Sequence, residues 1–171
     1  MAKWKQCLAQ GLVAGSLASV LSMAGAALAS RRQTGSAAAA TNAVSHWLWG
    51  DESLYRNSTT LTYTGVGYAT HHAASVFWGT LHALAAHNRP ALQTPKGIAL
   101  GALATSVVAA VVDYQVVSRR FTPGFEHRLS TGAMVGIYAL LAVGLGAGAL
   151  AMRRQRDTGT ASPLLQVGNF G

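Results

Sequence analysis

The side chains best suited to chemistry lie inside apolar stretches of the chain. His71 and His72 stand near the middle of residues 61–86, a run of 26 residues without Lys, Arg, Asp or Glu. Asp113 is the only acidic residue inside any of the long apolar runs. Ionisable groups within a membrane are costly, and they usually face a partner or a water-filled cavity. These three side chains are therefore the first candidates for a functional site.

Other polar side chains share a helical face with His71. Because successive residues of an α-helix turn by about 100°, Ser75 and His82 fall on the same side of a helix over residues 61–86. One side of this helix is polar, whereas the remainder is Ala, Val, Phe and Leu. We expect Ser75 and His82 to extend the site as a polar face or relay.

Asp113 is predicted to come to the depth of the two histidines. When the chain is folded at the turn before the apolar run that contains Asp113, Asp113 comes to the level of His71 and His72, within about one helical turn. When it is folded at the turn after that run, Asp113 comes near Tyr138 on the next apolar run. The lone acid, the two imidazoles and Tyr138 should therefore meet at mid-depth on neighbouring helices.

Several chemistries fit such a cluster. One is a buried hydrogen-bonded pair that fixes helix register, since a buried charge must be paired. A second is a transition-metal site on His71, His72 and Asp113, although adjacent histidines diverge by about 100° on a regular helix. A third is a proton or ion relay through His71, Asp113 and His82. Haem is a fourth, but only one apolar run contains histidine, so a second axial ligand must come from elsewhere.

The composition is typical of a membrane protein. Of 171 residues, 50% are hydrophobic and 11% are charged, against about 25% charged in an ordinary soluble domain. The net charge of +8 lies mostly in lysines and arginines just outside the apolar runs. That placement favours contact with anionic lipid headgroups in a bilayer and argues against nucleic acid as a partner.

The apolar runs predict an all-α fold, an integral membrane bundle of four transmembrane helices. The spans are about 6–29, 61–86, 97–117 and 131–152, so that residues 1–152 form a single transmembrane domain. The first run ends in an Ala-Leu-Ala sequence, which leaves signal-peptide cleavage open, but its length favours a retained span. Residues 153–171 are polar, and we expect them to form a disordered tail.

A short interfacial helix is predicted in the first loop, over residues 37–49. Trp47, Trp49 and Tyr55 carry amphipathic rings that favour the headgroup level, so this segment should lie on the membrane surface. His46 within it is expected to be solvated rather than a ligand.

The orientation of the chain is not decided by its charges. Seven lysines and arginines fall on the side of the two termini and six on the opposite side, and so small an excess does not orient a membrane protein. The basic start of the chain favours both termini in the cytoplasm.

The expected function follows from what the apolar runs contain. Glycines spaced by four residues recur in them, as at Gly11 and Gly15, and suit close helix packing. The sequence holds no nucleophile elbow, zinc-protease motif or phosphate-binding loop. We therefore expect a non-enzymatic membrane protein that acts by helix packing, as a homo-oligomer or as an accessory subunit. The alternative is a metal-binding or proton- or ion-relaying protein built on His71, His72 and Asp113.

Three segments resemble small, uncharacterised bacterial inner-membrane proteins that span the membrane several times. They are SHWLWGD at residues 45–51, GYATHHAASVFW at residues 67–78 and RRFTPGFEHRLS at residues 119–130. The resemblance covers most of residues 1–152. It implies a bacterial inner membrane and brings no activity or site residues with it.

Overall fold

The computed structural model describes residues 3–160, with side chains described through residue 158. Helices make up 86% of the chain, and no strand occurs among the described residues. Three helical segments are long and apolar enough to cross a membrane: α1 (Lys3–Thr34), α6 (Pro95–Val111) with its continuation to Val116, and α7 (Thr131–Thr160). The prediction of an all-α fold is confirmed, and these three helices indicate a membrane protein.

A fourth long helix, α4 (Val66–Ala86), carries three histidines and has no membrane-length stretch as apolar as those of the other three. A π-helical segment, η2 (Leu61–Gly65), leads into it, and a second one, η3 (Val112–Val116), ends α6. Short π-helical segments are rare and are frequently found at functional sites. The crossing of the membrane by residues 61–86 stays a prediction.

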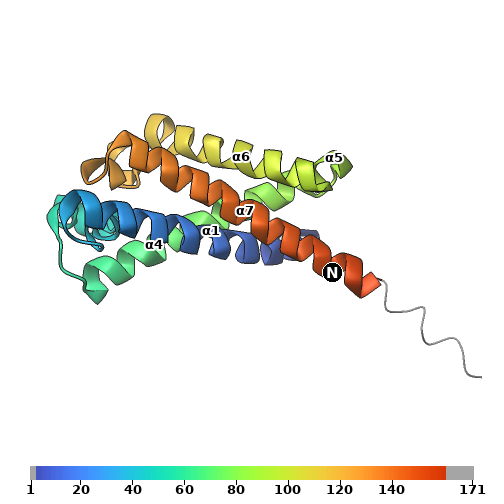
Figure 1. Ribbon diagram of the computed structural model, residues 1–171, viewed down its shortest axis with the longest axis horizontal. Coiled ribbons are helices and arrows are strands. Elements are labelled where there is room, and N and C mark those ends of the chain that lie inside the picture. The colour runs from blue at the N-terminus through green and yellow to red at the C-terminus, as the bar shows by residue number, and fades with distance from the viewer. Residues whose placement is uncertain (1–2, 161–171) are drawn as a thin grey trace, which may run out of the picture.

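The four long helices run in alternating directions (Figure 1). α1 packs along both α4 and α7, and α6 packs on the other side of α7, so the lateral order is α4, α1, α7, α6. The loops at 35–60 and 117–130 lie at one end of the bundle. The short helix α5 (Pro90–Gln93) and both described chain ends lie at the other end (Figure 1).

Small residues make the closest helix contacts. A Cβ atom added at Gly15 of α1 would overlap the backbone of Ser75 and Val76 on α4. On the opposite face of α1, a Cβ at Gly144 of α7 would overlap the backbone of Ala18. Such backbone-to-backbone approach is typical of helices packed within a membrane. We call these two contacts of α1, with α4 and with α7, the glycine seams.

The large apolar side chains of the long helices point outward rather than inward. The side chains that are completely buried are mostly small or polar, and Leu145 is the largest of them. Many aliphatic and aromatic side chains on the four long helices are exposed, among them Leu12, Phe77, Leu103, Val107 and Val143. A soluble protein would place such side chains in its core, so this distribution also indicates a lipid-facing exterior.

The first loop is not the surface helix that we expected. It folds as α2 (Ala39–Val44), α3 (His46–Trp49) and the 3₁₀ helix η1 (Gly50–Tyr55), and every residue of α2 is buried. α2 can pack closely against α4 because its alanines are small and because a Cβ at Gly67 of α4, which glycine lacks, would overlap the Thr41 carbonyl. The exposed side chains of this loop that suit the membrane surface are Leu48 and Trp49 of α3 and Tyr55 of η1.

Asn42 ties the first loop together from within. Its amide donates to the carbonyls of Arg56 (2.9 Å) and Ser58 (3.0 Å), and its Oδ1 accepts a hydrogen bond from the Thr64 hydroxyl (2.6 Å). The side chain of Asn42 is fully buried. Its hydrogen bonds thus hold the end of the loop against the start of α4.

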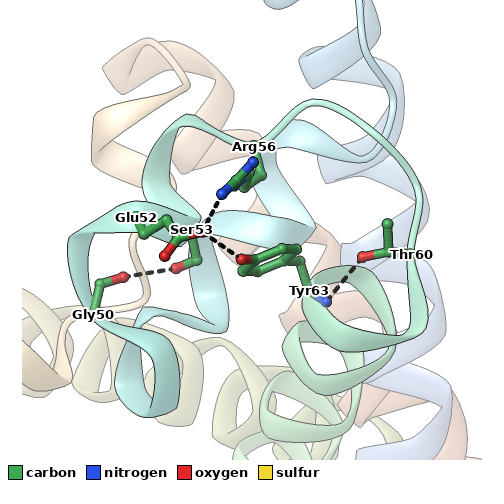
Figure 2. A network of polar contacts seen from close by, with 6 residues as sticks. All are labelled: Gly50, Glu52, Ser53, Arg56, Thr60 and Tyr63. Carbon is green, nitrogen blue, oxygen red and sulfur yellow. Dashed lines mark hydrogen bonds and ion pairs between the residues drawn. The ribbon is translucent and has the colours of Figure 1, made fainter.

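A surface network joins the same loop to η2 (Figure 2). Glu52 accepts a hydrogen bond from the Tyr63 hydroxyl at 2.7 Å and pairs with Arg56. The Thr60 hydroxyl accepts a hydrogen bond from the Tyr63 backbone N–H (3.1 Å), which caps the start of the helix. The hydrogen bond from Tyr63 and the charge of Arg56 lower the pKa of the Glu52 carboxyl.

The third loop folds over the same end of the bundle. It contains the 3₁₀ turns η4 (Arg119–Phe121) and η5 (Phe125–His127), joined through Gly124 at a φ of +83°. The Trp47 indole donates to the Thr122 carbonyl at 2.8 Å and so links this loop to α3. We call α2, α3, η1, η4 and η5 together the cap.

His46 is buried in the cap, contrary to the expectation that it is solvated. Only 4% of its surface is exposed, and its Nδ1 lies 2.8 Å from the Ala43 carbonyl. Gly124 makes room for it, because a Cβ at that position would lie 3.1 Å from His46 Nδ1. The composition of the loop concealed this burial, which results from the two loops closing on each other.

α7 also departs from the expected boundary at residue 152. The helix continues to Thr160, and Arg153 pairs with Asp157 across one turn at 3.5 Å. Residues 153–160 are therefore helical rather than a disordered tail. The remainder of that predicted tail, residues 161–171, lies outside the described residues.

Candidate functional site

The site lies where two long helices separate. α4 and α6 meet near His82, whose Nδ1 lies 3.2 Å from the Thr105 hydroxyl, and they diverge toward the cap (Figure 1). The cap closes this wedge at its open end, and a cavity of about 60 Å³ remains inside. The polar side chains in its wall are Ser22, Thr70, His71, Ser75, Asp113 and Tyr138. We call it the central cavity.

His71 is held on the α1 side of the central cavity. Its Nε2 lies 2.9 Å from the Ser22 hydroxyl, and that hydroxyl lies 2.7 Å from the Ala18 carbonyl. A carbonyl can only accept, so Ser22 gives its single proton to Ala18 and accepts from His71 Nε2. Phe125 of the cap packs against the imidazole at 5.9 Å between ring centroids. The ring is thus fixed from both sides.

Asp113 is held on the α7 side. The Tyr138 hydroxyl donates to Asp113 Oδ2 at 2.6 Å, a short bond of the kind that an acceptor with negative charge forms. Tyr114 packs edge-on against the Tyr138 ring at 6.1 Å. Asp113 belongs to the π-helical segment η3, so its carboxylate projects from an irregular turn and not from a regular α-helix.

Asp113 and His71 have different partners, although the sequence suggested that they pair with each other. His71 is bonded to Ser22 and Asp113 to Tyr138, and no ion pair joins the two among the described residues. Both nevertheless line one cavity. The prediction that His71 and Asp113 lie at the same depth therefore agrees with the structure, whereas the prediction that they pair with each other does not.

Of the six predicted site residues, four line the central cavity: His71, Ser75, Asp113 and Tyr138. His72 is outside it and stacks on Tyr68 at 5.9 Å, and its Nδ1 is buried without a hydrogen-bond partner. His82 lies near the opposite end of α4, on the wall of a separate hollow. The divergence of adjacent side chains on a helix separates His72 from His71.

The donor set around the central cavity is small. Among the described residues, no three His, Cys, Asp or Glu side chains come close enough together to hold one metal ion. His71 and Asp113 are the two potential ligands in the wall, and each is engaged with a hydroxyl. A metal ion on His71, His72 and Asp113, and likewise haem, stay predictions to which this geometry adds nothing.

Sequence reasoning missed Ser22 and the cap residues of the cavity wall. Ser19 and Ser22 stand out as polar residues within the first apolar run, and both are fully buried. The polarity of these two serines within an apolar run could have marked them in the sequence, whereas glycine and alanine spacing does not. Trp47, Pro123 and Phe125 also line the cavity. They reach it because the two loops fold over the bundle, and helical periodicity cannot predict such folding.

Comparisons with family models, with curated proteins and with solved structures find no match to this chain.

Proposed function

We propose that the chain is an integral membrane protein with four spans, α1, α4, α6 with η3, and α7, in a bacterial inner membrane. The support is the outward placement of the large apolar side chains, which on α4 includes Phe77, Leu81 and Leu84. The alternating helix directions put the two loops of the cap at one end and both described chain ends at the other. With both termini in the cytoplasm, the cap faces the periplasm.

Topology reporters test the four-span arrangement. Fusions after residues 56, 90, 124 and 158 should report periplasm, cytoplasm, periplasm and cytoplasm in turn. If α4 does not cross, the reporters at 56 and 90 will agree with each other. That result would contradict the proposal even if the other three helices are embedded.

Within this bundle we propose that the central cavity relays protons. The observation that carries the proposal is that two titratable side chains from helices on opposite sides, His71 and Asp113, line one cavity. Each is bonded to a hydroxyl, and a hydroxyl can both accept and donate a proton. A volume of about 60 Å³ leaves room for a few waters, since one water needs about 10–15 Å³ by such a measure. Protons can therefore pass between the two groups through water.

Proton flux into liposomes tests the relay. The purified chain is reconstituted with a pH-sensitive dye inside and a potassium diffusion potential across the membrane. We expect flux above that of empty liposomes, and flux at the empty level for His71→Gln and for Asp113→Asn. His72→Gln is the matched control, because it removes the neighbouring imidazole, which lies outside the cavity.

Two outcomes would count against the relay. One is a wild-type flux equal to that of empty liposomes. The other is an equal loss in the His72 control, which would point to general damage to the bundle. Elemental analysis of protein purified without a histidine tag separates a relay from a metal site, because only the latter retains a metal in stoichiometric amount.

A second candidate, a helix-packing role as a homo-oligomer or accessory subunit, is favoured by one specific observation. Most glycines on the long helices pack against other helices of the same chain, but Cβ atoms added at Gly132 and Gly136 would meet open space. Val135 beside them is exposed. This face of α7 is suited to a helix from another chain. Native mass measurement in a mild detergent tests it, and a strict monomer without a co-purifying protein would overturn it.

A further inference from the structure

The cap contains a second hollow that the proton relay does not use. Its volume is about 540 Å³, and its wall includes charged side chains from both loops. They are Asp51, Arg119, Arg120, Glu126 and His127, beside the buried His46. We call it the cap hollow.

His46 is one of the residues of this wall, and its ring has an unused hydrogen-bond acceptor. Its Nδ1 lies 2.8 Å from the Ala43 carbonyl, so Nδ1 carries the proton and donates it there. In the neutral ring Nε2 is then an acceptor, and it has no hydrogen-bond partner although it is buried. Leaving a buried polar group unpaired costs free energy that a bound donor would recover.

Glu126 contributes a second unpaired acceptor. Its Oε1 lies 3.8 Å from His127 Nε2, whereas its Oε2 is buried and has no partner. Asp51 adds another carboxylate to the same wall. Acceptors of this number and charge call for a cationic group with several N–H donors, such as a primary ammonium.

Two arginines in the wall of the cap hollow supply positively charged N–H donors, in contrast to the acceptors described above. Arg119 and Arg120 are exposed, and neither has an ion-pair partner among residues 3–158. Arg120 reaches only the Trp47 carbonyl, at 3.5 Å. Guanidinium groups bind phosphate through paired, charge-assisted hydrogen bonds. The wall is thus complementary to a ligand that has both an ammonium and a phosphate.

Exposed rings surround the cap at this end of the bundle. Trp49 is 46% exposed, Tyr55 71% and Phe121 46%. Amphipathic aromatic side chains concentrate at the level of lipid headgroups. The cap hollow therefore lies at the depth where zwitterionic headgroups are found.

We propose that the cap hollow binds a phosphoethanolamine group. Its ammonium donates to His46 Nε2 and to the Glu126 carboxylate, and its phosphate is held by Arg119 and Arg120. The group belongs either to a phospholipid headgroup or to a free amino-phosphate, which share this chemistry. The proposal is independent of the relay in the central cavity.

Native mass spectrometry of the full chain in detergent tests the proposal. The probes are dihexanoyl phosphatidylethanolamine and dihexanoyl phosphatidylcholine, which share a phosphate but differ in that trimethylammonium has no N–H. We expect the ethanolamine lipid to bind about tenfold more tightly, as the loss of hydrogen bonds to charged groups implies. Equal binding of the two lipids would overturn the proposal.

Variants locate the binding to the cap hollow. Arg119→Gln with Arg120→Gln should weaken the ethanolamine lipid about tenfold through lost charge-assisted bonds to phosphate. The matched control is Arg31→Gln with Arg32→Gln, an exposed arginine pair on α1 outside this wall. Glu126→Gln should reduce the preference for ethanolamine over choline, because the charge-assisted hydrogen bond from the ammonium is lost, and it should weaken both lipids through the lost carboxylate charge. An equal loss in the control pair, or an undiminished preference in Glu126→Gln, would refute the site.

The source of the group is settled by competition. If free phosphoethanolamine displaces the short-chain lipid at a similar concentration, the ligand is a soluble amino-phosphate. If it does not, the acyl chains contribute and the ligand is a lipid headgroup. Both results support the chemistry of the site, and the thermal unfolding midpoint of each variant separates lost binding from lost folding.

Discussion

The glycine seams and the wedge between α4 and α6 show how helices of similar composition pack in two different ways. At the seams, Gly15 and Gly144 remove the side chain at the point of contact, and the backbones of three helices touch. In the wedge, His71, Asp113 and Tyr138 instead line a cavity, and their hydrogen bonds run to side chains on neighbouring helices. The difference teaches that small residues mark the closed contacts of this bundle and large polar side chains mark the place where a cavity remains.

The seams bring helix backbones into contact, and the wedge places the titratable side chains His71 and Asp113 around a cavity. A close-packed interior has no space for water, whereas a polar cavity can hold it. The two regions of this chain therefore differ in whether space remains between the helices.

The largest effect is expected from Gly15→Ala. The added methyl group would overlap the α4 backbone, which cannot move aside as a side chain can, so the variant should lose about 3 kcal/mol of unfolding free energy. Gly136→Ala is the control, because its Cβ would meet open space and the gain in helix propensity should leave the protein unchanged or stabilised by up to about 1 kcal/mol. Thermal or denaturant unfolding in one detergent measures both. Equal effects would mean that the seams do not carry the stability.

Asn42→Ala should follow in size. It removes three hydrogen bonds, two to the end of the first loop and one to Thr64 in the segment that leads into α4, and the groups left unpaired should cost about 2–3 kcal/mol. The wedge should also open to water, which hydrogen exchange of the amides in α4 would detect. Asn88→Ala in the exposed turn after α4 serves as the comparison. If exchange in α4 is unaltered, the cap does not seal the wedge.

Asp113→Ala should have a moderate effect. It leaves the Tyr138 hydroxyl without its acceptor, for a loss of about 1–3 kcal/mol. Asp113→Asn should cost less, because the amide oxygen still accepts from Tyr138. A double-mutant cycle with Tyr138→Phe should show a coupling of about 0.5–3 kcal/mol, whereas a cycle with His72→Ala should be additive. Additivity with Tyr138 would show that the bond does not contribute to stability.

The smallest effect is expected from Glu52, in the surface network that lies outside both regions. Its pKa is lowered in the folded state by the Tyr63 hydrogen bond and by Arg56. A carboxyl with a lowered folded pKa stabilises the protein above its unfolded value of 4.5, and this contribution is lost as the pH falls through the folded value. Glu52→Gln should therefore flatten the acid side of a plot of unfolding midpoint against pH. An unchanged slope would show that the network adds nothing.

Apolar length and composition were enough to predict the long helices. Residues 6–29 lie within α1, 97–117 coincide with α6 and η3 to within two residues, and 131–152 lie within α7. Apolar length finds these helices because each one must cover a stretch of bilayer. Apolar length does not predict the end of α7, because the helix continues past Met152 through charged residues, among which Arg153 pairs with Asp157 one turn later.

The candidate site was predictable in depth and not in contacts. Tyr138 could be assigned to the level of Asp113, because the turn between their helices is short. The bond from His71 to Ser22 could not be derived in this way, since it joins α4 to α1 across a long loop. Burial of α2 was equally hidden, because alanines that suit a surface helix also suit a tightly packed one.

The lateral order α4, α1, α7, α6 has a consequence for how the chain is made. The first and last long helices form the centre of the bundle, and the two middle helices flank it (Figure 1). During synthesis, the α1 surface around Ala18 has no cover until Gly144 and the rest of α7 have left the ribosome. Contacts between distant parts of a chain form late and slowly. Until α7 is made, α1 and α4 can therefore form only an open hairpin, whose small residues Ala14 and Ala18 are left uncovered on the side that α7 will occupy.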